Sequence, residues 1–360
     1  MALRMSFLIL TLVVGASYVI LLVILTGHYN SAFGRYLTIA HQLIKSNGTD
    51  SVKNNVSNLK TANTLSSYDR HDSRLIVNSH EYKLLVDEPR ACYDAAGAPR
   101  EVFLLVLITT IHAHTEQREA VREMWGSPRE VRGKQIVTLF LLAQNKDANL
   151  THMQQVVEES NKHHDLLQED FQDAYKNLTL KTIMGMKWAS THCPHASFVM
   201  KTDDDIYVSY DNLVKHLTNL STPSKNYAVG CLIRDALPFR DPKSKWYMSK
   251  ELYPGRMYSP YLSGAGYVVT GDLAGKIYQL SLKLQYLHIE DVFVGECLKS
   301  LNIMPMDSSQ FTCWKNPGHS YCRLQQMITI HELAPSEMRK MWSDHQHQIK
   351  CYNETDLITS

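Results

Sequence analysis

SFVMKTDDDIYV, from Ser197 to Val208, is the stretch of sequence that decides the fold. Its first part, Ser197–Lys201, is an apolar run of strand length that leads into three aspartates, Asp203, Asp204 and Asp205. In open α/β sheets, ligands bind at the carboxyl ends of strands, so carboxylates at this position face a crevice. Carboxylates held together raise one another's pKa unless a cation lies among them, and Mg²⁺ or Mn²⁺ suits carboxylate oxygens. The stretch therefore predicts a metal-binding strand end, with a solvated acidic loop as the alternative.

Apolar runs of strand length alternate with helical patterns around this stretch. Strands are expected at Val102–Ile111, Ile136–Ala143, Leu166–Phe171 and Ser197–Lys201, and helices at His114–Trp125, Asn149–Lys162, Leu178–Thr191 and Tyr207–Leu217. Continuous apolar strands are typical of a parallel sheet that is buried on both faces. The alternation predicts an α/β fold of Rossmann-like build, with a mostly parallel central sheet and flanking helices. In the first helix we expect Thr115 as the N-cap and Gly126 as the stop.

The composition is that of a globular protein whose net charge is too small to give a strong electrostatic field. The 360 residues are 44% hydrophobic and 20% charged, and 37 Lys and Arg against 36 Asp and Glu leave a net charge of +1. A near-neutral chain has no basic surface to gather nucleic acid, so that class of partner is disfavoured. The seven cysteines show no zinc-type spacing. They predict up to three disulfides with one thiol left over, and the sequence leaves their pairing open.

The N-terminal region predicts a membrane anchor. Phe7–Leu25 is an uncharged run of 19 residues, about 28 Å long as a helix, which is longer than the apolar core of a signal peptide. Few charges precede it, so we expect a type II orientation with a lumenal body. Residues 46–67 are mostly Ser, Thr and Asn and predict a flexible stalk. Passage through the secretory lumen is supported by sequons that begin at Asn47, Asn55, Asn149, Asn177, Asn219 and Asn353.

The acidic strand end and the lumenal location together indicate a class of substrate. A cation held by few carboxylates commonly shares its coordination shell with substrate phosphates. In the secretory lumen, the phosphate-bearing substrates that fit best are nucleotide sugars. Transfer of their sugar needs a cation for the leaving diphosphate, donors that hold the nucleotide, and a base for the acceptor hydroxyl.

Sequence blocks in a fixed order resemble a known family. REAVREMWG, Arg118 to Gly126, resembles the R-x-A-x-R-x-T-W-G motif of the β-1,3-galactosyltransferase family. The blocks that follow in the family's order are NLTLKTIMGMKW (Asn177 to Trp188), FVMKTDDDIYV (Phe198 to Val208), SKWYMSKELYPGRMYSPYLSGAGYVVTGD (Ser244 to Asp272), LHIEDVFVGECLKSLNI (Leu287 to Ile303) and ITIHELAPSEMRKMW (Ile328 to Trp342). The resemblance covers about Pro89 to Cys351. It implies a GT-A fold, an inverting mechanism, dependence on Mn²⁺ and a Golgi type II membrane enzyme.

We therefore divide the chain into five parts. These are a cytosolic stub (1–5), a transmembrane signal-anchor (6–26), a stem (27–88), a lumenal GT-A catalytic domain (89–351) and a C-terminal tail (352–360). The sequence does not decide the oligomeric state, and a homo-oligomer is compatible with it.

The resemblance implies roles for the acidic residues. Asp203 and Asp204 would lie against the nucleotide, and Asp205, together with Asp203, would bind the metal, Mn²⁺ or Mg²⁺. His331 would be a second protein ligand, with a structural histidine as the alternative. Glu290 and Asp291 would supply the catalytic base. The family's pattern favours Asp291 for this role, and a helix-capping acid is the alternative.

Basic residues and glycines are expected at the nucleotide and the sugar. Arg118 and Arg122 lie one turn apart on one predicted helix face, so both could reach a bound nucleotide, or both could be surface charges. Lys181 is a further, weaker nucleotide contact. Gly264 and Gly266 would let the backbone approach a sugar closely.

Neighbouring positions depart from the family's form or are less specific. The glycine segment commonly reads C-S-G-T-G in the family, whereas this chain has Leu262 and Ala265. Trp246 and Tyr247 are candidates for stacking on a sugar, or for core aromatics. The histidines His112, His114, His163 and His164 form no metal pair at helical spacing, and we expect ordinary roles for them.

The resemblance thus implies transfer of galactose from UDP-galactose to a sugar hydroxyl, with a β-1,3 linkage and the O3 of a terminal N-acetylhexosamine as the expected target. UDP-N-acetylglucosamine is the alternative donor. Two other readings are a catalytically silent lumenal glycan-binding protein and a metal-dependent hydrolase of nucleotide diphosphates. The sequence leaves the acceptor open.

Overall fold

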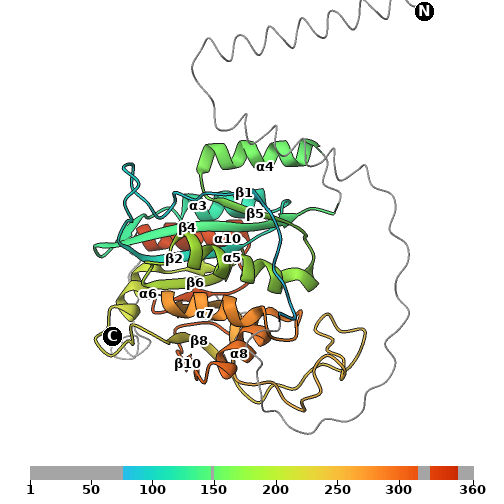
Figure 1. Ribbon diagram of the computed structural model, residues 1–360. Coiled ribbons are helices and arrows are strands. Elements are labelled where there is room, and N and C mark those ends of the chain that lie inside the picture. Colours follow the sequence, from blue (N-terminus) through green and yellow to red (C-terminus); the bar gives the residue numbers. More distant parts are fainter. Residues whose placement is uncertain (1–75, 147–149, 315–324, 348–360) are drawn as a thin grey trace, which may run out of the picture. The chain divides into compact units, whose positions relative to one another are not determined.

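The computed structural model describes residues 76–146, 150–314 and 325–347 (Figure 1). The predicted signal-anchor, the stem up to residue 75 and the predicted tail lie outside the described residues. In the described part of the chain, no helix has both the length and the apolar character needed to cross a membrane. The described residues divide into two units, residues 150–161 in the first and residues 76–146, 162–314 and 325–347 in the second. In the first unit the described residues belong to helix α4 (Leu150–His163), as the sequence predicted.

The second unit is built on a nine-stranded mixed sheet with the order β1-β5-β4-β2-β6-β9-β8-β10, in which β3 pairs with β4. Its strands are β1 (Leu84–Val86), β2 (Val102–Thr109), β3 (Glu130–Val131), β4 (Lys134–Gln144), β5 (Leu166–Gln172), β6 (Phe198–Asp203), β8 (Ala228–Ile233), β9 (Tyr261–Thr270) and β10 (Met306–Asp307). The four predicted strands are the parallel neighbours β5, β4, β2 and β6, which confirms that part of the prediction. Beyond them the sheet is mixed, because β9 runs antiparallel to both β6 and β8.

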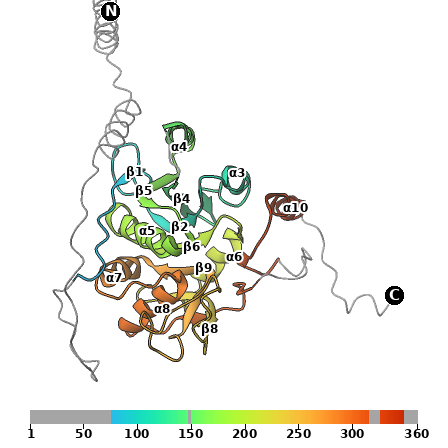
Figure 2. The same cartoon turned by 90° about the vertical axis from the view of Figure 1, so that its right-hand side faces the viewer.

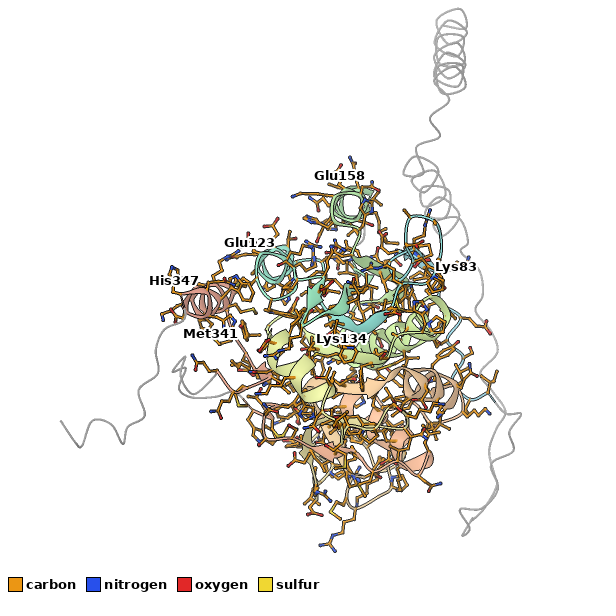
Figure 3. The ribbon with its side chains drawn as sticks, turned by 90° about the vertical axis from the view of Figure 1, so that its left-hand side faces the viewer. Lys83, Glu123, Lys134, Glu158, Met341 and His347 are labelled. Atoms are coloured by element: carbon orange, nitrogen blue, oxygen red, sulfur yellow. A yellow bond between two sulfur atoms is a disulfide. The ribbon has the colours of Figure 1, made fainter. Side chains whose placement is uncertain are left out.

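Helices cover the central strands, whose side chains are buried almost throughout. Figure 2 shows α5 (Leu178–His192) and α7 (Gly271–Ser281) on one side of the sheet, and α3 (Thr115–Glu123), α6 (Tyr210–Leu217) and α10 (Pro335–Gln346) on the other. α10 lies beside α3 (Figure 3), and the two helices are joined by an ion pair between Arg339 of α10 and Glu123 of α3 at 2.9 Å. α5 is buried around most of its circumference. The helix η1 (Tyr175–Asn177) precedes α5, and α8 (Glu290–Ser300) packs against β9.

Two local predictions were wrong. The predicted helix Tyr207–Leu217 begins only at Tyr210, because Tyr207–Val208 form strand β7, which pairs antiparallel with β11 (Thr329–Ile330). Ser209 caps α6 by accepting a hydrogen bond from the Asn212 N–H. Thr115 is the first residue of α3 rather than its N-cap, and the cap position belongs to His114.

Disulfides cross-link the described residues, and an N-terminal strand extends the fold beyond the predicted start of the catalytic domain. Cys92 bonds to Cys193 and Cys231 to Cys313, while Cys297 is a buried free thiol. Cys322 and Cys351 lie outside the described residues. β1, within the predicted stem, pairs with β5, so the fold includes residues on the N-terminal side of Pro89.

Two glycines of α7 provide a matched test of packing. A Cβ at Gly271 would lie 1.9 Å from the Ala196 carbonyl oxygen, whereas a Cβ at Gly275 would meet only the Ser190 Cβ at 3.4 Å. Gly271→Ala should therefore lower the free energy of unfolding of the full-length protein by about 1–3 kcal/mol or more, because backbone must move. Gly275→Ala should leave it unchanged or raise it by up to about 1 kcal/mol, because alanine favours helix. Urea unfolding followed by circular dichroism measures both, and equal effects would contradict this account of α7.

Candidate active site

The aspartate triplet lies at the carboxyl end of β6, beside the carboxyl end of β2. The register pairs Thr109 with Asp203 across these two strands. The Thr109 hydroxyl donates to Asp203, and the Thr110 hydroxyl donates to Asp204 Oδ2 at 2.5 Å. His114 Nδ1 lies 2.9 Å from the same Asp204 oxygen, and this hydrogen bond raises the pKa of His114. The structure thus gathers the triplet at the strand edge where the sequence predicted a ligand site.

A buried lysine joins the triplet to a second acidic pair. Lys201 is 1% exposed, and its ammonium donates to Asp203 Oδ1 at 2.9 Å and to the Gly264 carbonyl at 2.8 Å. The same nitrogen lies 3.5 Å from Glu290 Oε2. Burial opposes the charged form, but the carboxylates outweigh it and raise the pKa of Lys201. Lys201 therefore stays cationic and fixes β6, β9 and α8 to one another.

Asp205 is the member of the triplet that fits a cation. The contacts to lysine and histidine go to Asp203 and Asp204. Burial, followed by the charges of Asp203 and Asp204, raises the pKa of Asp205 to about 7. A divalent cation would remove the repulsion that causes this shift.

His331 lies in the segment that returns beside this loop. β11 pairs with β7 through Ile330 and Tyr207, and the Leu333 N–H donates to the Asp205 carbonyl at 2.9 Å. His331 follows β11 directly, so the chain brings it to the triplet from the far end of the sequence. Among the described residues, no group of three or more His, Cys, Asp or Glu side chains is arranged to hold a metal. A metal-binding role of His331 stays a prediction.

Arg118 and Lys181 support the loop that follows β2. Arg118 is 1% exposed, and its guanidinium donates to the Ile111 carbonyl at 2.7 Å and to the Thr110 hydroxyl at 3.3 Å. Lys181 donates to the Thr110 carbonyl at 2.6 Å and to Asp173 at 2.9 Å. Burial lowers the pKa of Lys181, although nearby carboxylates oppose the shift. Both cations therefore hold the loop whose Thr110 contacts Asp204.

Arg122 has a different partner from Arg118. Its Nε and Nη2 donate to the two carboxylate oxygens of Asp165, at 2.7 and 2.8 Å, and its guanidinium lies 4.8 Å from the centre of the Phe140 ring. Asp165 directly precedes β5, whereas Asp203 ends β6. A nucleotide contact of Arg122 stays a prediction.

Glu290 and Asp291 differ in environment although they are neighbours at the start of α8. Glu290 is 4% exposed and is engaged by the Tyr267 hydroxyl at 2.7 Å and by Lys201. Asp291 accepts hydrogen bonds from the backbone N–H groups of Gly264 at 3.2 Å and Val292 at 2.8 Å. Burial, followed by the charge of Glu290, raises the pKa of Asp291 to about 7. Asp291 therefore has the proton affinity of a base that works near neutral pH, and Glu290 is held in an ion pair.

The two predicted glycines face different neighbours. A Cβ at Gly264 would lie 3.3 Å from Glu290 Oε2 and 3.5 Å from Asp291 Oδ2. A Cβ at Gly266 would lie 3.0 Å from Thr329 Cγ2 and 3.3 Å from Met200 Cε. Gly264 thus allows β9 to approach the carboxylates of Glu290 and Asp291, whereas Gly266 allows it to pack against β11.

Sequence reasoning missed Lys201 and His114. A lysine inside an apolar strand was a usable signal for Lys201, because a buried ammonium must have a partner. His114 had no such signal, because its contact with Asp204 joins residues that are far apart in the sequence. Trp246 is 42% exposed, packs against Phe239 with ring centres 5.3 Å apart, and has the Lys245 ammonium 4.5 Å from the centre of its ring, so stacking on a sugar stays a prediction.

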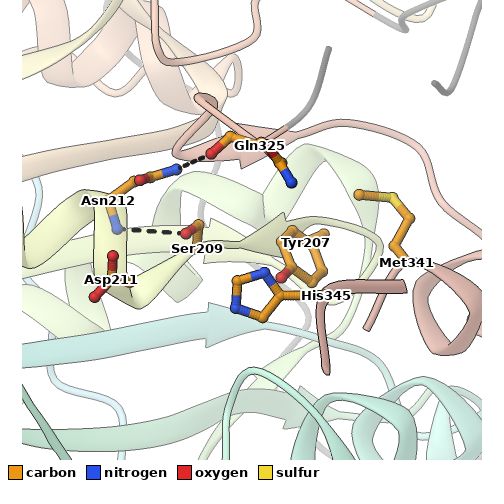
Figure 4. Close-up of a pocket in the computed structure, with 7 residues that line it drawn as sticks. All are labelled: Tyr207, Ser209, Asp211, Asn212, Gln325, Met341 and His345. Atoms are coloured by element: carbon orange, nitrogen blue, oxygen red, sulfur yellow. Dashed lines mark hydrogen bonds between the residues drawn. The ribbon is translucent and has the colours of Figure 1, made fainter. Parts of the chain in front are cut away.

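A pocket of about 170 Å³ lies at the start of α6 and contains none of the predicted site residues. Figure 4 shows Met341 and His345 of α10 facing Tyr207 and Ser209. The Asn212 side chain closes one side by donating to the Gln325 carbonyl at 2.8 Å.

Comparisons with known proteins relate this chain to galactosyltransferases. The Galactosyltransferase family model matches residues 116–309. The chain is 45% identical to β-1,3-galactosyltransferase 1 of Mus musculus over 74% of this chain and 80% of that protein. It is 40% identical to β-1,3-galactosyltransferase 2 of Homo sapiens, over 74% of this chain and 63% of that protein.

Likenesses to solved structures are more distant. The galactosyltransferase LgtC, solved with donor and acceptor sugar analogs, is 10% identical with a TM-score of 0.34, over 70% of this chain and 98% of that chain. A Drosophila β-1,4-galactosyltransferase 7, solved with manganese, UDP-Gal and xylobiose, is 8% identical with a TM-score of 0.34. The likeness covers 72% of this chain and 80% of that chain. At such TM-scores neither likeness establishes a shared fold.

The residues matched by the family model, 116–309, include the strand-end aspartates and the acidic start of α8. This chain belongs to the β-1,3-galactosyltransferase family.

Proposed function

We propose that this protein is an inverting, GT-A type glycosyltransferase that moves galactose from UDP-galactose to a sugar hydroxyl in a β-1,3 linkage. The observation that carries the proposal is the position of Asp291. Its carboxylate is held by the Gly264 N–H, and the Lys201–Glu290 pair next to it connects it to Asp203. A base and a cation-binding triplet are thereby held together. The two β-1,3-galactosyltransferases support the sugar and the linkage.

Asp291 carries the proton transfer in this mechanism. Its carboxylate takes the proton of the acceptor hydroxyl, and that oxygen forms a bond to the anomeric carbon of the donor sugar. The bond between that carbon and the diphosphate oxygen breaks, and UDP leaves from the opposite face, so an α-linked donor gives a β-linked product. A pKa of about 7 suits this role, because a base is most effective when its pKa is near the working pH.

The remaining site residues would hold the donor. Asp205 and His331, with Asp203, would hold Mn²⁺ or Mg²⁺, which when bound supplies positive charge for the departing diphosphate. Arg118 and Lys181 position the loop after β2, and Asp204 is fixed by Thr110 and His114. The nucleotide would then lie across the carboxyl ends of β2 and β6.

We further propose that the protein is a type II membrane protein of the Golgi with a lumenal catalytic domain. The uncharged run Phe7–Leu25 and the sequons support this location. The two disulfides also support it, because such bonds persist in oxidising compartments.

The first test is a donor and acceptor panel on the purified full-length protein. UDP-galactose and UDP-N-acetylglucosamine are offered with N-acetylglucosaminides and N-acetylgalactosaminides, and both free UDP and glycoside product are measured. We expect transfer of galactose with Mn²⁺ and its loss with a chelator. Asp205→Ala should lose Mn²⁺-dependent UDP binding, whereas Asp211→Ala, which removes a half-exposed carboxylate of α6, serves as the control.

Other outcomes of this panel would change the proposal. Transfer from UDP-N-acetylglucosamine alone would keep the mechanism and replace the donor. UDP release without any glycoside product would favour a hydrolase. Glycan binding without turnover would indicate a silent glycan-binding protein.

Asp291→Asn should lower the rate of transfer by at least about 10²-fold, the lower end of what acid–base catalysis contributes. UDP and Mn²⁺ affinities should be kept, because Asp291 lies outside the triplet. Asp272→Asn is the matched control, since it also removes a carboxylate from the first turn of a helix. The measurement is the initial rate of transfer at a saturating donor concentration for both variants. Near-normal turnover of Asp291→Asn would rule out Asp291 as the base.

The pH profile should report the raised pKa of Asp291. The base must be deprotonated, and its pKa of about 7 means that the active fraction declines below neutral pH. kcat/KM for the acceptor should therefore fall roughly tenfold per pH unit below about pH 6. UDP affinity measured over the same range separates this effect from titration of the triplet. A profile that stays flat down to pH 5 would contradict the assignment.

A further inference from the structure

His114 lies at the surface beside the aspartate triplet, and the protein uses one of its two ring nitrogens. Nδ1 lies 2.9 Å from Asp204 Oδ2, while 38% of the His114 side chain is exposed. Nε2 makes no hydrogen bond within the described residues and is not one of their buried unpaired nitrogens, so it faces solvent. Because a carboxylate oxygen only accepts, Nδ1 donates to Asp204 and Nε2 stays available to a ligand.

The loop between β2 and α3, which carries His114, is held from within the fold. Lys181 donates to the Thr110 carbonyl at 2.6 Å. His112 Nε2 lies 2.9 Å from the Ala143 carbonyl of β4. The loop is thus fixed before any ligand binds, and a binding group on a fixed loop loses little conformational entropy when the ligand arrives.

The order of the strands places His114 on one side of the triplet and Asp291 on the other. β2, which precedes the loop of His114, is one neighbour of β6. β9 is the other neighbour, and its Gly266 pairs with Thr202 at the carboxyl end of β6. The Gly264 N–H of this part of β9 donates to Asp291. The triplet therefore lies between the imidazole of His114 and the start of α8.

A nucleotide sugar is a linear molecule whose diphosphate lies between the sugar and the ribose. In the proposed function Asp291 acts at the anomeric carbon of the sugar, and a cation at Asp205 acts at the diphosphate. The ribose then lies on the far side of the triplet from Asp291. The group that the structure presents on that side is the open nitrogen of His114.

A ribose hydroxyl suits this nitrogen in both of its protonation states. A neutral imidazole presents a lone pair at Nε2, and an imidazolium presents an N–H there. A hydroxyl can donate to the first and accept from the second. A phosphate oxygen would fit the charged ring alone.

We propose that His114 Nε2 binds a ribose hydroxyl of the donor nucleotide, while Asp204 holds the ring through Nδ1. The proposal rests on the proposed function and adds to it a nucleotide-binding residue that the acidic motifs do not include. The ligand class is a ribonucleotide, which this contact distinguishes from the matching deoxyribonucleotide.

His114→Asn tests the contact, because the asparagine amide can replace Nδ1 against Asp204 but offers no group at the position of Nε2. The dissociation constant for UDP in the presence of Mn²⁺, measured by calorimetric titration of the full-length protein, should rise roughly 3- to 10-fold, the loss of one hydrogen bond. The KM for UDP-galactose should rise by the same factor. Unchanged UDP affinity in His114→Asn would overturn the proposal.

His164→Asn is the matched control. His164 also lies near a carboxylate, with its Nδ1 3.8 Å from Glu88 Oε2, and its side chain is 65% exposed. It precedes β5, at the opposite edge of the parallel strands from the loop after β2. Its backbone has a φ of 55° to within a degree of the printed 54°, which asparagine tolerates. UDP affinity should not change in this variant, and a loss equal to that of His114→Asn would contradict a local contact.

Deoxy analogues of UDP separate a ribose contact from mere support of Asp204. Either 2′-deoxy-UDP or 3′-deoxy-UDP should bind the wild-type protein roughly 3- to 10-fold more weakly than UDP does. His114→Asn should bind that analogue about as well as it binds UDP. If His114→Asn weakens UDP and both analogues by the same factor, the imidazole makes no ribose contact and the proposal is overturned.

Failure of the proposed function would be visible separately, because the readout is UDP binding rather than transfer. A wild-type protein that transfers no sugar but loses UDP affinity in His114→Asn would keep the ribose contact and overturn the transfer reaction. Sugar transfer with a UDP affinity that does not depend on His114 would do the reverse. No Mn²⁺-dependent UDP binding by the wild-type protein would overturn both.

Discussion

The buried ammonium of Lys201 is the interaction on which the site depends. It lies at the meeting point of three elements, with Asp203 from β6, the Gly264 carbonyl from β9 and Glu290 from α8 as its partners. A charge that is 1% exposed cannot be left without them, because loss of one partner from a buried pair costs about 3–5 kcal/mol. The spacing between the aspartate triplet and the start of α8 is therefore set by electrostatics within the core.

This constraint also explains why two adjacent acids at the start of α8 differ. Glu290 is committed to Lys201 and Tyr267, so its charge is neutralised within the protein. Asp291 receives only backbone donors and the repulsion of Glu290, in a place where burial disfavours its charge. One residue is thereby a structural anion and the next a base with a raised pKa, although their side chains have nearly the same chemistry.

The part of the fold that the sequence predicted is the part whose signal is local. β2, β4, β5 and β6 are buried on both faces, so each is a continuous apolar run that one window reveals. β7 was mistaken for the first turn of a helix, because its strand character comes from pairing with β11, more than a hundred residues later. The acids were visible from their position after a strand and from family motifs. The contacts of Lys201 with Gly264 and Glu290, and of His114 with Asp204, were not, because they are made across the fold.

The partners of the basic residues around the triplet show how the charges of the three aspartates are balanced. Helical spacing placed Arg118 and Arg122 on one face, yet Asp165 engages Arg122 and the loop after β2 engages Arg118. Lys201 neutralises Asp203, and Thr110 and His114 hold Asp204. The protein thus supplies partners for two of the three aspartates. Among the described residues, the third, Asp205, is left with the repulsion of both neighbours, and a divalent cation would neutralise this excess negative charge.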